Sequence, residues 1–182
     1  DCPESRGLGD VYKRQTDEFA ALSHSRVASS IENNIWEQEI VKVDDIGHKD
    51  EDHVVHNCTK ESLAELRTAF GPKSLVTAGN ASGVVDGAAA VVIKSASKAK
   101  QDGDKPLAKI ISWGIVGLEP AIMAYGPVPS SKKALEKAGL AIEDIDRWEI
   151  NEAFAGQAVA CVKDLGLDIN KVNVNGGAVG IG

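Results

Sequence analysis

The sequence is poor in the features that mark several classes of protein. Its three cysteines, Cys2, Cys58 and Cys161, are odd in number and widely separated, so they indicate neither a disulfide framework nor a zinc cluster. A reducing, cytoplasmic compartment is the simplest expectation. No apolar run in the sequence approaches the roughly twenty residues of a membrane-spanning helix. The net charge of −7 argues against a nucleic-acid partner, which would need a basic face.

A metal site is also not expected. Three histidines and a cysteine fall in one charged stretch, at His48, His53, His56 and Cys58. They lack the paired spacing of a zinc knuckle, so we interpret them as solvated loop residues and predict no metal ligand among them.

What the chain does have is ordinary for part of a soluble enzyme. Apolar residues make up 43%, enough for a sizeable core, and 182 residues correspond to one domain or parts of two. Residues 1–15 show no sustained helical or strand period and lack the apolar centre of a signal peptide. We interpret them as a non-native-looking leader and expect regular structure only from Thr16, where acidic residues begin a helix.

From there the hydrophobic pattern alternates between the two types of element. Short apolar runs predict strands, and apolar residues at helical spacing predict helices. Alternation of this kind favours an α/β layered fold with mainly parallel strands. Beyond the helix that begins at Thr16, the predicted helices cover residues 63–70, 97–101, 129–138 and 152–165, and the predicted strands cover 39–43, 88–93, 107–113, 148–150 and 172–174.

Five segments then carry a resemblance to a known family. Their order and spacing resemble those of the thiolase family, and the similarity covers residues 16–182. The segments are 77–83 (TAGNASG), 86–90 (DGAAA), 123–129 (MAYGPVP), 151–154 (NEAF) and 173–178 (NVNGGA).

The resemblance implies a fold and a division of the chain. A thiolase-like fold has layered α/β/α/β/α architecture built from two similar halves. Residues 16–104 would be the end of the N-terminal half, and residues 105–182 would be a truncated C-terminal half. The boundary falls in the turn-rich stretch 102–106, which contains aspartates, Gly103 and Pro106.

The resemblance also implies an activity. Thiolases transfer an acyl group to or from coenzyme A, by 3-ketoacyl-CoA thiolysis or acetoacetyl-CoA formation, through a cysteine acyl-enzyme. Acyl-CoA and CoA would be substrates within fatty acid metabolism, no cofactor would be bound covalently, and the parent would be a homo-oligomer, a dimer or tetramer. In the family the nucleophilic cysteine lies upstream of this sequence, a histidine follows the glycine matched by Gly182, and a second cysteine follows later. We therefore expect an acyltransferase parent and an inactive fragment.

The first site residues implied by the resemblance are polar or small. Asn151 matches an asparagine that serves an oxyanion hole, a role that suits a neutral amide; the alternative is that it caps a helix beginning at Glu152. Glu152 itself is expected to be a supporting or helix-N-terminal carboxylate. Ala78 and Ser82 match positions along the pantetheine arm, where small residues let the backbone come close to a ligand; the alternative is a plain tight turn.

The remaining site residues are implied for the acyl group. Phe154 and Met123 match the wall of the acyl pocket, although either could be ordinary core. Gly177 matches the backbone that approaches the thioester, with a strand-end turn as the alternative.

Two other classes of protein were considered from the residues. A dinucleotide-binding domain would use the glycines that follow the predicted strand 172–174, but Gly180 and Gly182 supply only the first two glycines of that fingerprint. A non-catalytic thiolase-like protein that binds acyl-CoA or lipid would keep Asn151 and the glycine turn. The residue after Gly182 would separate these, because histidine there favours the enzyme.

Overall fold

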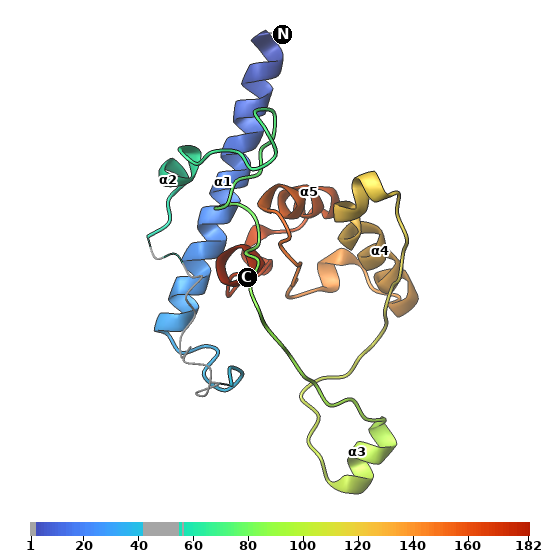
Figure 1. Cartoon of the computed structure of the whole chain (residues 1–182). Helices are drawn as coiled ribbons and strands as arrows, with labels where there is room; N and C mark the ends of the chain where they lie inside the picture. The colour runs from blue at the N-terminus through green and yellow to red at the C-terminus, as the bar shows by residue number, and fades with distance from the viewer. Residues whose placement is uncertain (1–2, 42–54, 56) are drawn as a thin grey trace.

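The computed structural model describes residues 3–41, 55 and 57–182, with side chains from Tyr12 onward. Its longest element is helix α1, Pro3–Glu32, which lies along one side of the molecule (Figure 1). Helices α2, α5 and α6 pack against α1, and α4 packs on the other side of α5. Within the described residues, no helix is both long enough and apolar enough to cross a membrane.

Helix α1 begins earlier than the sequence predicted. Regular structure was expected from Thr16, and this was wrong, because α1 begins at Pro3. A helix extends at little cost once its first turn has formed. The added turns also find partners: Lys13 pairs with Asp17 one turn later, and Gln15 accepts a 2.7 Å hydrogen bond from Lys163 of α5.

The other predicted helices are present with shifted ends. Those expected near 97–101 and 129–138 were confirmed, and the helix expected over 152–165 begins later, at Ala155. The last two end at Gly139 and Gly166, with φ of +67° and +65°. The helix expected over 63–70 ends early, because the Thr68 hydroxyl donates to the carbonyl of Gly71 and the chain turns there. The elements after α1 are α2 Lys60–Ala64, α3 Ala96–Asp102, η2 Pro120–Tyr125, α4 Pro127–Ala138, η3 Ile142–Asp144, α5 Ala155–Leu165, η4 Ile169–Lys171 and α6 Ala178–Ile181.

The predicted strands are not formed as strands in the described residues. Segments 88–93 and 107–113 are extended but unpaired, and the prediction for 39–43 lies partly outside the described residues. Segments 148–150 and 172–174 lie side by side in parallel, the direction predicted for most of the strands, but they share a single bridge, between Trp148 and Val172. A strand exists only through a ladder with a neighbour, so an apolar run without one stays extended and unpaired.

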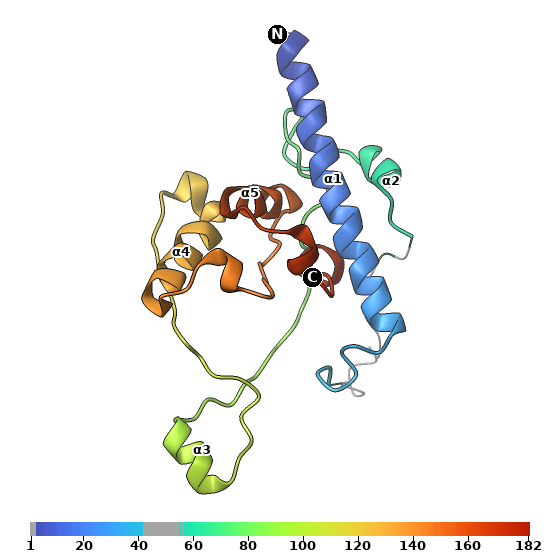
Figure 2. The same cartoon turned by 180° about the vertical axis from the view of Figure 1, so that it is seen from behind.

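The unpaired segments are therefore exposed. Figures 1 and 2 show α3 standing away from the other helices at the end of two extended stretches of chain. Val92 is 87% exposed and Ile110 is 63% exposed. Consecutive exposed apolar residues of this kind are typical of surfaces that another segment covers.

The buried core lies instead where α1, α2, α5 and α6 meet. Phe19 and Ala20 of α1 pack there with Leu63 of α2 and Val179 of α6. A second cluster joins α4 and α5 and contains Val128, Ile150, Cys161, Leu165 and Val172. The first cluster holds α5 and α6 against α1, and the second joins α5 to α4 and to segments 148–150 and 172–174.

Candidate active site

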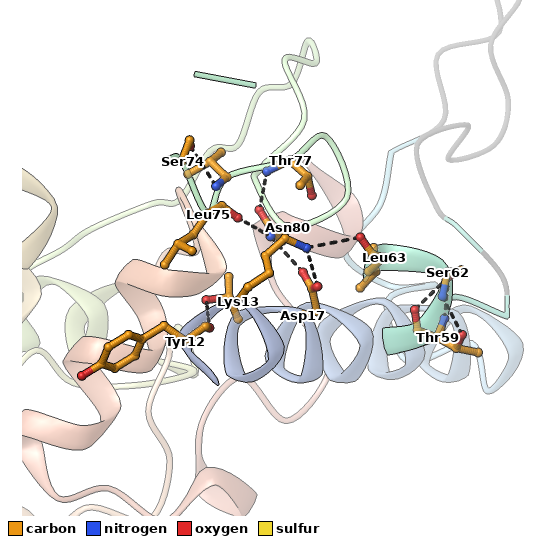
Figure 3. Close-up of polar contacts among 12 residues, drawn as sticks. Tyr12, Lys13, Asp17, Thr59, Ser62, Leu63, Ser74, Leu75, Thr77 and Asn80 are labelled. Carbon is orange, nitrogen blue, oxygen red and sulfur yellow. Dashed lines mark hydrogen bonds and ion pairs between the residues drawn. The ribbon is translucent and has the colours of Figure 1, made fainter. Parts of the chain in front are cut away.

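The loop 77–83 is held against α1 by one buried asparagine. The side-chain amide of Asn80 donates to Asp17 Oδ1 at 3.0 Å and to the Leu75 carbonyl at 2.9 Å, and its oxygen accepts from the Thr77 amide at 2.8 Å (Figure 3). Lys13 balances the charge of the buried Asp17 carboxylate. The bond to Asp17 ties the loop to α1, and the other two fix the conformation of the loop itself.

The same loop is bonded to the Asn151 segment, which we define as residues 150–154. The Ser82 amide donates to the Ala153 carbonyl at 3.1 Å, and the Ala155 amide donates to the Asn80 carbonyl at 2.8 Å. An antiparallel bridge also joins Ala81 to Phe154. The structure thus brings the stretch from Ala78 to Ser82 directly beside the Asn151 segment.

Asn151 is exposed, while both of its neighbours in the chain are buried. Asn173, at φ +44°, accepts from the Ile150 amide and donates to the Ile150 carbonyl, both at 2.8 Å. Its side-chain amide also donates to Glu152 Oε1 at 2.7 Å. The backbone around Asn151 is therefore fixed from both sides, and its side chain faces outward with amide donor and acceptor groups.

The alternative role for Asn151, as the cap of a helix that Glu152 begins, was wrong. Helix α5 begins at Ala155, and its N-cap residue is Phe154. Glu152 is accordingly not at the N-terminus of α5.

Glu152 is instead a buried acceptor that joins three parts of the chain. It is 1% exposed and accepts from Ser23 Oγ at 2.6 Å, from Asn173, and from the Val179 amide at 3.1 Å. The pKa of the nearby Glu149 is raised, mainly because Glu149 is partly buried and also because the negative charge of Glu152 lies close to it. Three donors compensate for taking the Glu152 carboxylate out of water.

The glycine turn, residues 175–177, fits closely between Glu152 and α1. A side chain at Gly177 would place its Cβ within 2.4 Å of the Glu152 carboxyl carbon. Gly176 has φ +87°, and a Cβ there would lie 2.7 Å from the backbone nitrogen of Val27. Both positions therefore require glycine, and Gly177 lies beside the Asn151 segment.

Phe154 and Met123, both predicted for the acyl group, lie in different surroundings. Phe154 lines a largely apolar cavity of about 410 Å³ between α1 and α5, together with Tyr12, Val76 and Gln157. Met123 lies in η2 and is 71% exposed. The backbone of Phe154 pairs with Ala81 of the loop 77–83 while its side chain lines the cavity, whereas Met123 lies at the surface of η2.

The described histidine and cysteines supply no metal cluster. Among the residues with described placement, no group of three His, Cys, Asp or Glu side chains could hold a metal ion. His48, His53 and His56 lie outside those residues. His24, which the sequence did not single out, is buried in α1 and bonds through Nε2 to the Gly79 carbonyl at 3.1 Å.

Both described cysteines are expected to be poor nucleophiles. Burial raises the pKa of Cys58 and of Cys161, so the thiolate fraction of each is below that of a free cysteine at any given pH. In the folded chain, the midpoint of iodoacetamide alkylation against pH is expected to lie higher for both than in urea, with peptide mapping separating the sites. Midpoints equal to those of the unfolded chain would contradict this.

Comparison with known proteins assigns the chain to a family. The model of the thiolase N-terminal domain matches residues 9–97, and the model of the thiolase C-terminal domain matches residues 104–182. The chain belongs to the thiolase family. It is 46% identical to the 3-ketoacyl-CoA thiolase of Marinobacter nauticus, covering 94% of this chain and 47% of that protein. It is 44% identical to the acetyl-CoA acetyltransferase of Rhizobium meliloti, covering 94% of this chain and 45% of that protein.

Solved structures agree on the fold. The chain matches the acetyl-CoA acetyltransferase of Bacillus anthracis with a TM-score of 0.88 and 42% identity, over 93% of this chain and 45% of that one. It matches human mitochondrial 3-ketoacyl-CoA thiolase in complex with CoA with a TM-score of 0.89 and 40% identity, over 93% and 43%. The fold is thiolase-like, and the chain spans less than half the length of these thiolases.

Sequence reasoning singled out the segments of this site but not the residues that hold them. Asn80 lies in segment 77–83 and Asn173 in segment 173–178, but the sequence predicted no role for either side chain. Asn173 carried one weak signal, since asparagine tolerates the left-handed conformation that it adopts here. Ser23 lies on the buried face of α1 and carried no signal that distinguishes it from other small helix residues.

Proposed function

We propose that the protein containing this chain transfers an acyl group to or from coenzyme A through a cysteine acyl-enzyme. The reaction would be thiolysis of a 3-ketoacyl-CoA or formation of acetoacetyl-CoA. The observation that carries the proposal is the exposed Asn151 side chain, set between two buried neighbours and beside loop 77–83. Membership of the thiolase family supports it.

In this proposal Asn151 stabilises negative charge on a carbonyl oxygen of the reacting thioester. Its amide is neutral, so it can donate a hydrogen bond to the oxygen without bringing in a charge that would compete with the enolate. A preorganised donor of this kind is worth roughly 3–4 kcal/mol in the transition state. The preorganisation comes from Asn173, which bonds the residues on both sides of Asn151.

Coenzyme A would approach along the small residues of the site. Ala78 and Ser82 have small side chains and Gly177 has none, which lets an extended pantetheine arm lie close to the backbone. The human thiolase that resembles this chain has been solved in complex with CoA, which supports CoA as the ligand. Phe154 and Met123 would bound the acyl group once the rest of the parent protein is present.

The chain alone is proposed to be inactive. Burial raises the pKa of Cys58 and of Cys161, which lowers the thiolate fraction of both described thiols, whereas acyl transfer needs a thiolate. The acyl-accepting cysteine and its activating histidine would come from the part of the parent that extends beyond the matched half of its relatives.

The wider setting follows from the family. We propose that residues 16–104 and 105–182 belong to two halves of a layered α/β/α/β/α fold, in which segments 88–93 and 107–113 become paired strands. The parent would act in the cytoplasm, in fatty acid metabolism, as a homo-oligomer. The yeast peroxisomal thiolase that resembles this chain is described as dimeric, which supports the last point.

A chimera tests the function. Residues 16–182 would replace the matching segment of the Marinobacter nauticus 3-ketoacyl-CoA thiolase, and CoA-dependent loss of acetoacetyl-CoA would be followed by absorbance. The chimera is expected to turn over, while the 182-residue chain is expected to match the blank. A folded chimera that binds CoA without turnover would contradict the proposal and favour a non-catalytic acyl-CoA or lipid-binding relative.

A further inference from the structure

Ser23 of α1 lies where the helix meets both Glu152 and the glycine turn. Its hydroxyl donates to Glu152 Oε2 at 2.6 Å and accepts from the Gly177 amide at 3.2 Å. Ser23 is 3% exposed, so neither bond competes with water. One hydroxyl therefore connects the carboxylate next to Asn151 with the backbone nitrogen of Gly177.

Other residues of α1 hold the same region but do not touch Glu152. Arg26 donates to the carbonyls of Val172 at 2.6 Å and Ile169 at 3.1 Å, and Ser30 donates to the Asn175 carbonyl at 3.0 Å. The two views of the fold agree that the C-terminal turn lies against the middle of α1 (Figures 1 and 2). The general docking of this region therefore does not depend on Ser23 alone.

A direct hydrogen bond to the Glu152 carboxylate distinguishes Ser23 from these other contacts. The buried Glu152 carboxylate receives three hydrogen bonds, and two of its donors, Asn173 and Val179, belong to the region that α1 holds. Among the described side chains of α1, Ser23 alone donates a hydrogen bond to this carboxylate, from 129 positions earlier in the chain, while Arg26 interacts with it through charge. Removing its hydroxyl would leave one carboxylate oxygen and the Gly177 amide short of a partner, and the local structure would shift to satisfy them.

We propose that Ser23 and Glu152 are positioning residues, through which α1 sets the orientation of Asn151 and of the Gly177 amide. Glu152 directly follows Asn151 in the chain, and Ile150 directly precedes it. The side chain of Asn173 donates hydrogen bonds to both of these neighbours of Asn151. A displacement of the carboxylate is therefore passed to both ends of the Asn151 backbone. The inference rests on the proposed function only for its effect on catalysis, since the positioning itself is a property of the chain.

Hydrogen exchange in the 182-residue chain tests the positioning. Ser23→Ala is compared with Ser25→Ala, which makes the same change at an exposed position of the same helix. In Ser23→Ala, amides in peptides covering residues 176–182 are expected to exchange about tenfold faster, the size expected for losing a hydrogen bond to a charged group. Amides of α5, residues 155–165, are expected to stay within about twofold of the unchanged chain.

A second variant tests whether the faster exchange comes from the lost hydrogen bond and not from some other effect of replacing the serine. Glu152→Gln keeps one acceptor oxygen and replaces the other with an NH2 group, which donates and cannot accept, so Ser23 and Asn173 cannot both keep their acceptor. The same localised acceleration is expected. Three outcomes would overturn the proposal: unchanged exchange over 176–182, an equal acceleration of α5 that indicates general unfolding, or no protection of 176–182 in the unchanged chain.

The chimera then separates positioning from function. With Ser23→Ala, kcat is expected to fall about tenfold while KM for CoA stays within about twofold, and Ser25→Ala is expected to leave both unchanged. If the parent chimera is inactive but the exchange pattern holds, the proposed function fails and the positioning stands. If the chimera is active and Ser23→Ala lowers KM and kcat no more than Ser25→Ala, the positioning role fails and the function stands.

Discussion

Replacement of Gly176 by alanine is expected to be the most destabilising single change in the glycine turn. Gly176 has φ +87°, where an L-residue is strained, and its new Cβ would lie 2.3 Å from Val27 Cγ2 and 2.9 Å from the Ser23 carbonyl oxygen. Because part of that obstacle is helix backbone, the turn itself has to move away from α1. Strain and overpacking together are expected to cost on the order of 3 kcal/mol.

Gly166→Ala is the matched control for this prediction. Gly166 also has a positive φ, +65°, but nothing lies within 4 Å of a Cβ placed there, so alanine brings strain without a clash. Urea unfolding followed by tryptophan fluorescence would compare the two variants. If Gly176→Ala were no more destabilising than Gly166→Ala, close packing of the turn on α1 would not be important for stability.

Replacement of Asn151 by alanine is expected to have the largest effect on activity. In the chimera it should lower kcat about 100- to 1000-fold, the loss typical of removing one oxyanion donor. KM for CoA should change little, because the lost interaction forms mainly in the transition state. Since the Asn151 side chain is exposed, thermal unfolding should be unchanged.

Asn170→Ala provides the control for this second prediction. Asn170 is also exposed, and it bonds to Asp168 within η4, in the same half of the chain. It should leave kcat unchanged. A loss of only a few-fold for Asn151→Ala would argue that its amide takes no part in stabilising the transition state.

The helices were largely predictable because their signals are local. Ala158, Cys161 and Leu165 recur on one face of α5 and are buried, and glycines end both α4 and α5. Where local signals compete, prediction failed. Leu66 and Phe70 continue a helical spacing, yet both are exposed, because the chain turns at Thr68.

Strands could not be predicted with the same success because pairing is not local. Segment 107–113 has the composition of a buried strand, but its pairing depends on a neighbour, and within the described residues it has none. In the same way, Phe154 was assigned to the acyl pocket from its motif, whereas the structure places it on a cavity beside α1. Its assignment to the acyl group remains a proposal.

The sequence by itself determined the family, most of the helices and the segments that form the site, because five short motifs at family spacing are local and specific. Tertiary structure alone decided how those segments are held. Glu152 became a buried acceptor because Ser23, 129 positions away, supplies a donor from α1. Asn151 stayed exposed because Asn173 holds both of its neighbours. Hydrogen bonds between residues so far apart leave no period in the sequence, and only packing α1 against α5 and α6 creates them.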